Sequence, residues 1–447
     1  MATGEPGEAR TVIMGAPLPP APPERSVVAP TGERIEVLDF VRGVALFGIL
    51  LLNITAFGLP EAYLNPQNAG GATGVNLLVW IVTQIGFEGT QRALFSMLFG
   101  ASIILFMARL EAAGRPDAAD IYVRRNLWLV GFGMMNAYFL IWYGDILYSY
   151  GLIALIVFPF RNLGARTLLI LGAGALLLAA SWNLWDARIL LQQNAAYEEA
   201  TAAQRAGETL TAYQTHAISA WETARANYVT TPEGVGWTTD AMRGGYVSAF
   251  WYVVPYNAYW QTWGLYRFFF DVFGMMLIGM ALFRMGVLTL HRRTGVYVWM
   301  MLAGYAVGLA VNFAETRWIM VNQFSPIAFA EAGVSYDIGR LSMTMGHLGA
   351  LLLFVRSRLL AWLRAAFAAV GRMAVTNYLM HSAVCLVLFV IMGWYNQLER
   401  HQLYYVVAVI WAFQLVFSPL WLRFFRFGPV EWIWRWLTYL KRPPLLR

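Results

Sequence analysis

The chain has 447 residues, of which 59% are hydrophobic and only 13% are charged, and its formal net charge is +7. A soluble domain carries roughly 25% charged residues, so this composition excludes an ordinary soluble protein and favours an integral membrane protein. The positive charge does not indicate nucleic-acid binding, because the arginines lie in short loops between apolar runs, where they set membrane topology.

The cysteine content and the N-terminal segment exclude further classes. The one cysteine, Cys385, lies in an apolar run, so neither an internal disulfide nor a thiolate metal site is expected. The sequence has no metal-ligand cluster, Walker motif or nucleotide fingerprint, and we expect no metal and no permanently bound cofactor. Residues 1–33 are proline-rich and precede the first apolar run, which predicts a disordered cytoplasmic tail rather than a signal peptide.

The apolar runs predict an all-α integral membrane protein. A crossing needs about 20 mostly apolar residues, and about ten runs qualify, the fourth of them being short. Arginine is concentrated in every second loop, which predicts ten transmembrane helices with both termini in the cytoplasm. The runs are 37–58, 90–109, 122–141, 145–160, 166–185, 265–284, 296–315, 338–356, 372–393 and 402–422.

A long polar segment divides the chain into two halves. Residues 34–185 form an N-terminal half of five helices, and residues 261–422 form a C-terminal half of five. The segment 186–260 between them is rich in acids, and we expect it to be external and mainly helical. The tail 423–447 alternates tryptophan and arginine, which is typical of a segment that lies along the cytoplasmic membrane interface.

Ionisable residues inside the apolar runs are candidate functional residues, because burying them in a membrane is costly. Asp39 and Arg42 lie at the cytoplasmic start of the first run. A second set lies near the outer helix ends, where it could line a polar cleft or form a solvated rim. Its members are Glu88, Arg92, Asp145, Arg267, Asp271, Asp337 and Arg340.

Two histidines are expected near the middle of the membrane. At about 1.5 Å per residue, His381 and His347 both lie roughly 12 to 13 Å from the nearer end of their helices. Asn136 and Asn377 lie at intermediate depth. A buried imidazole can act as a general base, and it can equally form a structural hydrogen bond between helices.

Five sequence motifs resemble the YeiB-like family of bacterial inner-membrane proteins, whose C-terminal half is a domain of unknown function. They are LDFVRGVALFGILLLNITAFGLP, FSMLFGAS, WYGDILYSYGL, GRMAVTNYLMHS and FGPVEWIWRWLTY, in this order between residues 38 and 439. The family is distantly similar to membrane-bound acyltransferases, which share the first-helix pattern of Asp39, Arg42 and Gly43. The family pattern has histidine where this chain has Asn136, and glutamine where it has His381.

The resemblance implies an acyltransferase that moves an acyl group from a carrier such as acyl-CoA to an envelope glycan or lipid. The carrier would bind to Asp39, Arg42, Arg124, Arg125 and Arg372 from the cytoplasm. The acceptor would bind to Glu88, Arg92, Asp145, Arg267, Asp271 and Arg340 from outside. His381 would act as the general base, with His347 or Asn136 assisting, and a continuous polar tunnel would join the two mouths.

Two other functions are open at this point. Ten helices divided five and five, with charged pairs at the outer face, also suit a transporter or exporter of a small envelope metabolite. A non-catalytic sensor or scaffold built around the external segment is the third. The expected partners are membrane lipids and the acceptor, and no nucleic acid, in the bacterial inner membrane.

Overall fold

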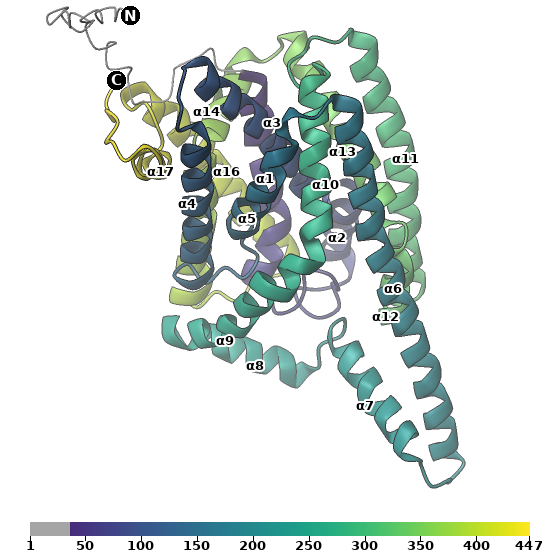
Figure 1. Ribbon diagram of the computed structural model, residues 1–447. Coiled ribbons are helices and arrows are strands. Elements are labelled where there is room, and N and C mark those ends of the chain that lie inside the picture. The colour runs from purple at the N-terminus through teal and green to yellow at the C-terminus, as the bar shows by residue number, and fades with distance from the viewer. Residues whose placement is uncertain (1–35) are drawn as a thin grey trace, which may run out of the picture.

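The computed structural model describes residues 36–447, and the predicted disordered tail 1–33 lies outside these residues. The described chain is a bundle of α-helices (Figure 1), and no β-strand is assigned within it beyond one isolated bridge between Phe425 and Leu446. The all-α prediction is therefore confirmed for this part of the chain.

The first half contains six helices where five spans are predicted. They are α1 (Glu36–Gly58), α2 (Gly74–Gly86), α3 (Thr90–Ala112), α4 (Ala118–Tyr138), α5 (Leu147–Val157) and α6 (Ala165–Arg205). Three shorter helices follow, α7 (Ala212–Ala226), α8 (Pro232–Arg243) and α9 (Tyr246–Tyr259). The α5 helix is shorter than the predicted span 145–160.

The second half begins where α9 passes through a π-helical turn, Trp260–Gly264, into α10 (Leu265–Arg284). The later helices are α11 (Thr294–Val321), α12 (Pro326–Gly333), α13 (Tyr336–Ser357), α14 (Ala361–Arg372), α15 (Ala374–Cys385), α16 (Arg400–Phe424) and α17 (Pro429–Tyr439). A π-helical turn, Leu386–Ile391, extends α15.

Eight helical segments are long and apolar enough to cross a membrane, which indicates a multi-pass membrane protein. All ten predicted runs coincide with helices, but α4 and α5 are not among the eight. The α4 helix carries Asp120, Arg124 and Arg125. The α5 helix has 11 residues, and at about 1.5 Å per residue it is roughly half as long as the hydrocarbon core is thick.

Glycines allow the central helices to approach closely. A Cβ atom at Gly43 of α1 would collide with the backbone of Phe367 in α14, and one at Gly371 with the backbone of Asp39. Small residues at such crossings let membrane helices pack backbone to backbone. This contact fixes the first turns of α1 against the end of α14, where Arg42 and Arg372 lie.

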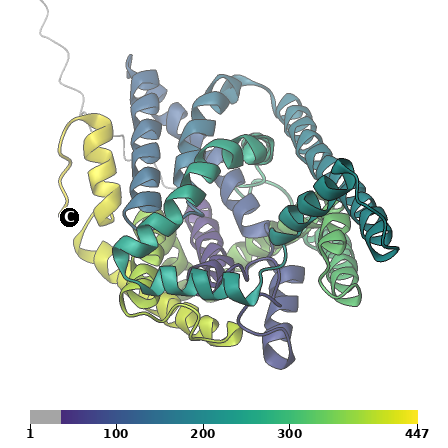
Figure 2. The ribbon, with the colours of Figure 1, turned by 90° about the horizontal axis from the view of Figure 1, so that it is seen from below.

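The segment 186–260 is helical, as predicted, but it begins within one continuous helix. The 41-residue α6 runs on past the bundle, and α7 packs back against it (Figure 1). The α8 and α9 helices lie across the same end of the bundle, which Figure 2 shows from below. At the opposite end, α17 contacts α4 and α15.

Candidate functional site

A large cavity in the described chain lies toward the end of the bundle that carries α7, α8 and α9. Its volume is about 560 Å³, and we call it the aromatic cavity. Its aromatic and charged side chains come from loops and from helices of both halves. The aromatic residues are Tyr63, Trp142, Tyr143, Tyr150, Tyr228, Trp260, Phe268, Phe329 and Tyr336, and the charged ones are Glu61, Glu88, Arg92, Asp145, Glu315 and Arg340.

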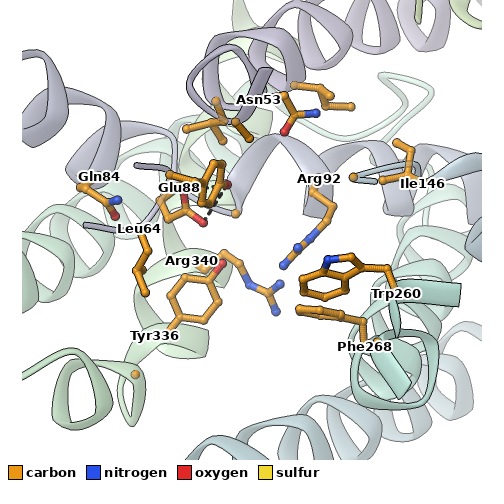
Figure 3. A pocket seen from close by; sticks show the side chains of 18 of the residues that line it. Asn53, Leu64, Gln84, Glu88, Arg92, Ile146, Trp260, Phe268, Tyr336 and Arg340 are labelled. Atoms are coloured by element: carbon orange, nitrogen blue, oxygen red, sulfur yellow. Dashed lines mark hydrogen bonds between the residues drawn. The ribbon is translucent and has the colours of Figure 1, made fainter. Parts of the chain in front are cut away.

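A chain of alternating charges supports one wall of the aromatic cavity. Arg340 donates to Asp271 through two parallel hydrogen bonds of 2.6 and 2.8 Å, and to Asp337 through a third of 2.7 Å. Asp271 also accepts from Arg92, over a longer 3.5 Å. Arg340 is only 1% exposed, so its charge is compensated inside the protein. Both arginines line the cavity (Figure 3), and Arg92 is the more exposed of the two, at 32% of its side chain.

The glutamates of the aromatic cavity accept hydrogen bonds from hydroxyl groups. Glu88 accepts from the Tyr63 hydroxyl at 3.1 and 3.3 Å, and Glu315 accepts from the Ser335 hydroxyl at 2.5 Å. Glu61 lies in the loop after α1, where burial of its carboxyl group beside Tyr252 and Tyr256 raises its pKa. The hydroxyl contacts thus hold the Glu88 and Glu315 carboxyl groups in place at the cavity.

The second cavity lies at the end of the bundle where α17 packs, and its volume is about 230 Å³. Five arginines line it, Arg42, Arg109, Arg125, Arg372 and Arg435, against two acids, Asp39 and Glu431. We call it the arginine cavity. An excess of guanidinium groups around a small hollow suits a phosphate-bearing or other anionic ligand.

The α17 helix closes one side of the arginine cavity. Glu431 accepts hydrogen bonds from the backbone N–H groups of Val375 and Thr376 at 2.7 and 3.0 Å, so it caps the first turn of α15. It also accepts from the Thr376 hydroxyl at 2.6 Å, and burial raises the pKa of its carboxyl group. Trp434 donates to the Arg125 carbonyl at 2.8 Å, and its ring lies 4.1 Å from the Arg125 guanidinium.

The two cavities meet at a thin wall formed by the loop before α5 and by the side of α3. Asp145 and Ile146 line the aromatic cavity, and Leu147, the next residue, lines the arginine cavity. Tyr150 lines the aromatic cavity, while Phe95 and Phe99, whose rings pack against it, line the other. The predicted continuous tunnel is thus replaced by two separate cavities with a common wall.

Asp145 is the carboxylate in this wall, and its position is fixed by two donors. Asn136 of α4 donates to Oδ1 at 2.8 Å, and the backbone N–H of Tyr148 donates to Oδ2 at 2.8 Å. The Tyr378 hydroxyl accepts from the N–H of Ile146 at 3.2 Å, which joins this loop to α15. Asn136 therefore reaches the site through Asp145.

The two predicted catalytic histidines line neither cavity. The Nε2 atom of His381 lies 3.0 Å from the amide oxygen of Gln414 in α16, and the ring is 2% exposed. The Nε2 atom of His347 lies 2.7 Å from the Gly86 carbonyl, and its Nδ1 atom lies 3.1 Å from the Tyr305 hydroxyl. Both side chains form hydrogen bonds between helices, and their catalytic role stays a prediction.

The other predicted site residues divide between the cavities and their surroundings. Asp39, Arg42, Arg125 and Arg372 come together in the arginine cavity, and Glu88, Arg92, Asp145 and Arg340 in the aromatic cavity. Asp271 is not in the cavity lining, but it accepts two hydrogen bonds from Arg340. Arg124 lines neither cavity, and Arg267 pairs with Asp186 and donates to Asn183 instead.

Several cavity residues were not predicted from the sequence. Glu431 and Arg435 belong to the motif FGPVEWIWRWLTY, so their place in a motif was the available signal. Arg109 is one of the loop arginines for which the sequence predicts only a role in membrane topology. Trp260 and Phe268 carry no charge, and nothing in the sequence distinguishes them from other membrane aromatics.

Comparison with known proteins gives full-length relatives. The chain is 31% identical to "Uncharacterized protein YeiB" of Escherichia coli K12, over 93% of this chain and 98% of that protein. It is 29% identical to "Uncharacterized protein YxaH" of Bacillus subtilis 168, over 93% and 97%. It is 26% identical to an "Uncharacterized 39.9 kDa protein in amylase 3'region" of Bacillus acidopullulyticus, over 93% and 96%.

A family model and the solved structures complete the comparison. Residues 282–441 match the model described as "Protein of unknown function (DUF418)", and this stretch includes Arg340, Arg372, Glu431 and Arg435. No solved structure matches the chain. With nearly complete coverage of a relative 31% identical, the chain belongs to the YeiB-like, DUF418-containing family of membrane proteins.

Proposed function

We propose that this protein is a membrane-embedded acyltransferase of the bacterial inner membrane that moves an acyl group from a carrier to an envelope glycan or lipid. The carrier, such as acyl-CoA, binds in the arginine cavity, and the acceptor binds in the aromatic cavity. The coexistence of the two cavities in one conformation carries this proposal. A transferase that moves the acyl group directly from one substrate to the other must hold both at once, with their reactive groups close together.

The proposed topology places the two substrates on opposite sides of the membrane. We extend the eight candidate spans to ten crossings by adding α4 and the short α5, with both termini in the cytoplasm. The arginine cavity then opens to the cytoplasm, in agreement with the concentration of arginine in alternate loops. The aromatic cavity then opens to the external side, which is the side that carries the segment 186–260.

The proposed reaction takes place at the wall, where Asp145 lies. The acceptor oxygen or nitrogen attacks the thioester carbonyl, the new C–O or C–N bond forms, and the C–S bond breaks. Asp145 accepts the proton of the acceptor and passes it to the leaving thiolate. Asn136 acts as a positioning residue for Asp145. Leu147 and the Phe95–Tyr150 contact must move apart for the acyl group to pass.

Turnover by the purified protein tests the proposal. The full chain in lipid nanodiscs would be given acetyl-CoA and an extract of envelope lipids and glycans, and free thiol would be measured. We expect thiol release that depends on the extract and that falls at least 100-fold in Asp145→Asn. Arg358→Gln, an exposed change outside both cavities, is the matched control. Equal thiol release by the wild-type protein and by Asp145→Asn would exclude this mechanism.

A transporter of a small envelope metabolite is the second candidate, favoured by the closed wall between the two cavities. Alternating access requires one cavity to close when the other opens. The variant Leu147→Cys introduces a thiol at the wall. Its labelling by membrane-impermeant thiol reagents, added from each side in turn, would show which cavity is open. Substrate-dependent accessibility that alternates between the sides, without thiol release from acetyl-CoA, would favour the transporter.

A further inference from the structure

We propose that the aromatic cavity binds an acidic group, a carboxylate or a phosphate, through Arg92, on a molecule that otherwise presents hydroxyl groups. This names the chemical class of the acceptor and in that sense rests on the proposed function. The binding itself is argued from the cavity alone and is tested without any carrier.

Arg92 is the arginine of the charge chain whose guanidinium N–H groups are least engaged in hydrogen bonds with the protein. Arg340 donates three hydrogen bonds of 2.6 to 2.8 Å, whereas Arg92 donates one of 3.5 Å to a carboxylate already engaged by Arg340. The Arg92 side chain is 32% exposed, against 1% for Arg340. Since both lie in the cavity wall, the exposed guanidinium is the one that an incoming anion can reach.

The surroundings of Arg92 favour an acidic group that accepts two hydrogen bonds from its guanidinium. Its guanidinium lies 5.1 Å from the ring of Phe268, and that ring stacks on Trp260 at 5.4 Å. Figure 3 shows Arg92 pointing into the cavity between these rings and Tyr336. A guanidinium held over an aromatic face keeps its outer N–H pair free for a carboxylate or phosphate. The adjacent rings offer faces for the body of the ligand.

The glutamates of the cavity limit the ligand to one acidic group. Glu88 precedes Arg92 by four residues, and Glu61 and Glu315 line other parts of the cavity. Because Glu88 and Glu315 accept hydrogen bonds from hydroxyl groups of the protein, they are suited to accept them from ligand hydroxyls as well. A second anionic group beside these carboxylates would be repelled.

A matched series of sugars that differ only in charge tests the inference. The full-length protein in nanodiscs, without CoA, would be titrated with glucuronate, glucose 6-phosphate, glucose and glucosamine, and binding followed by the fluorescence of the cavity tryptophans. We expect an acid to bind at least tenfold more tightly than glucose, and glucosamine to bind no better than glucose. Whether glucuronate or glucose 6-phosphate is preferred distinguishes a carboxylate from a phosphate, and either preference supports the proposal.

Variants assign the binding to Arg92. We expect Arg92→Gln to weaken binding of the preferred acid roughly 10- to 100-fold, as for the loss of a charge-assisted contact. Arg92→Lys retains the positive charge but not the paired N–H donors, so it should lose less affinity. It replaces the glutamine variant in the test if that variant does not fold. Arg317→Gln, an exposed change on α11, should have no effect.

Three results would overturn the inference: binding of neither acid, tighter binding of glucosamine than of both acids, or unchanged binding in both Arg92 variants. Each of these is independent of turnover. A protein that binds the acids but releases no thiol from acetyl-CoA would refute the transferase proposal and leave the Arg92 site intact.

Discussion

The guanidinium of Arg340 and the carboxylate of Asp271 form a two-pronged ion pair between α13 and α10, with hydrogen bonds of 2.6 and 2.8 Å. Asp337 completes the cluster on the same side. Since Arg340 is 1% exposed, the pair joins two helices where water cannot replace either partner.

Replacing Arg340 by glutamine should therefore destabilise the protein strongly. The change leaves Asp337 without its cation and Asp271 with only the longer contact to Arg92. Breaking a buried pair from one side costs about 3–5 kcal/mol. Thermal unfolding in detergent should show a lower Tm for Arg340→Gln and no change for Arg188→Gln, which alters an exposed arginine of α6. A Tm equal to that of the wild type would mean that the cluster contributes nothing to folding.

The arginine cavity should bind CoA through charge. We expect Arg372→Gln and Arg125→Gln each to weaken CoA binding roughly tenfold, because each removes a cation from the lining. Added salt should weaken wild-type binding as well. Calorimetric titration of CoA checks both effects, with Arg358→Gln as the control. Binding that is insensitive to salt and to both substitutions would exclude this cavity as the carrier site.

Loss of the Glu431 cap should loosen α17. Glu431→Ala removes an acceptor from the first turn of α15, and a lost cap costs about 0.5–2 kcal/mol. We expect a lower Tm and weaker CoA binding, because α17 forms one side of the arginine cavity. Glu222→Ala on the exposed face of α7 is the control. Normal CoA affinity in Glu431→Ala would show that α17 does not shape the cavity.

The stability of the wild-type protein should also depend on Glu431 protonation. Burial raises the pKa of this carboxyl group above that of the unfolded chain. The folded state then holds a proton that the unfolded state has lost, so this contribution to stability is present at low pH and is lost as pH rises through the raised pKa. Comparing Tm between pH 5 and pH 8 should show a smaller decline in Glu431→Gln than in the wild type.

The two candidates for the general base, His381 and Asp145, lead to opposite predictions for turnover by the His381→Gln variant. If Asp145 is the base, His381→Gln should keep more than a tenth of wild-type thiol release from acetyl-CoA, because its imidazole contacts Gln414 and no cavity. If His381 is the base, as the sequence predicts, the same variant should lose at least 100-fold. The assay of His381→Gln beside Asp145→Asn decides between the two.

The sequence predicted the elements of this fold well because membrane helices are marked by their own composition. Runs such as 37–58 and 402–422 coincide with α1 and α16 to within two residues at each end. The concentration of charge at the two ends was also predictable, since depth follows from position along a helix. Arg42, Arg125 and Arg372 could therefore be grouped correctly from three separate segments.

The contacts of those residues were less predictable, because depth does not determine which way a side chain points. His381 and His347 were expected to approach a common tunnel, yet each faces a neighbouring helix. Asp145 lies in the loop before the short α5, and the sequence of a loop has no periodic pattern from which its path to the wall could be predicted. The two-pronged ion pair between Arg340 and Asp271 likewise depends on how α13 and α10 pack, which the sequence does not show.

The length of α6 offers a direct means of determining which side of the membrane each cavity faces. At about 1.5 Å per residue its 41 residues span roughly 60 Å, twice the hydrocarbon thickness of a bilayer. Its far end, at the Gly207 turn, therefore stands well clear of the lipid headgroups. A protease site placed in that turn would be cut in spheroplasts if this end is periplasmic, and only in inverted vesicles if it is cytoplasmic.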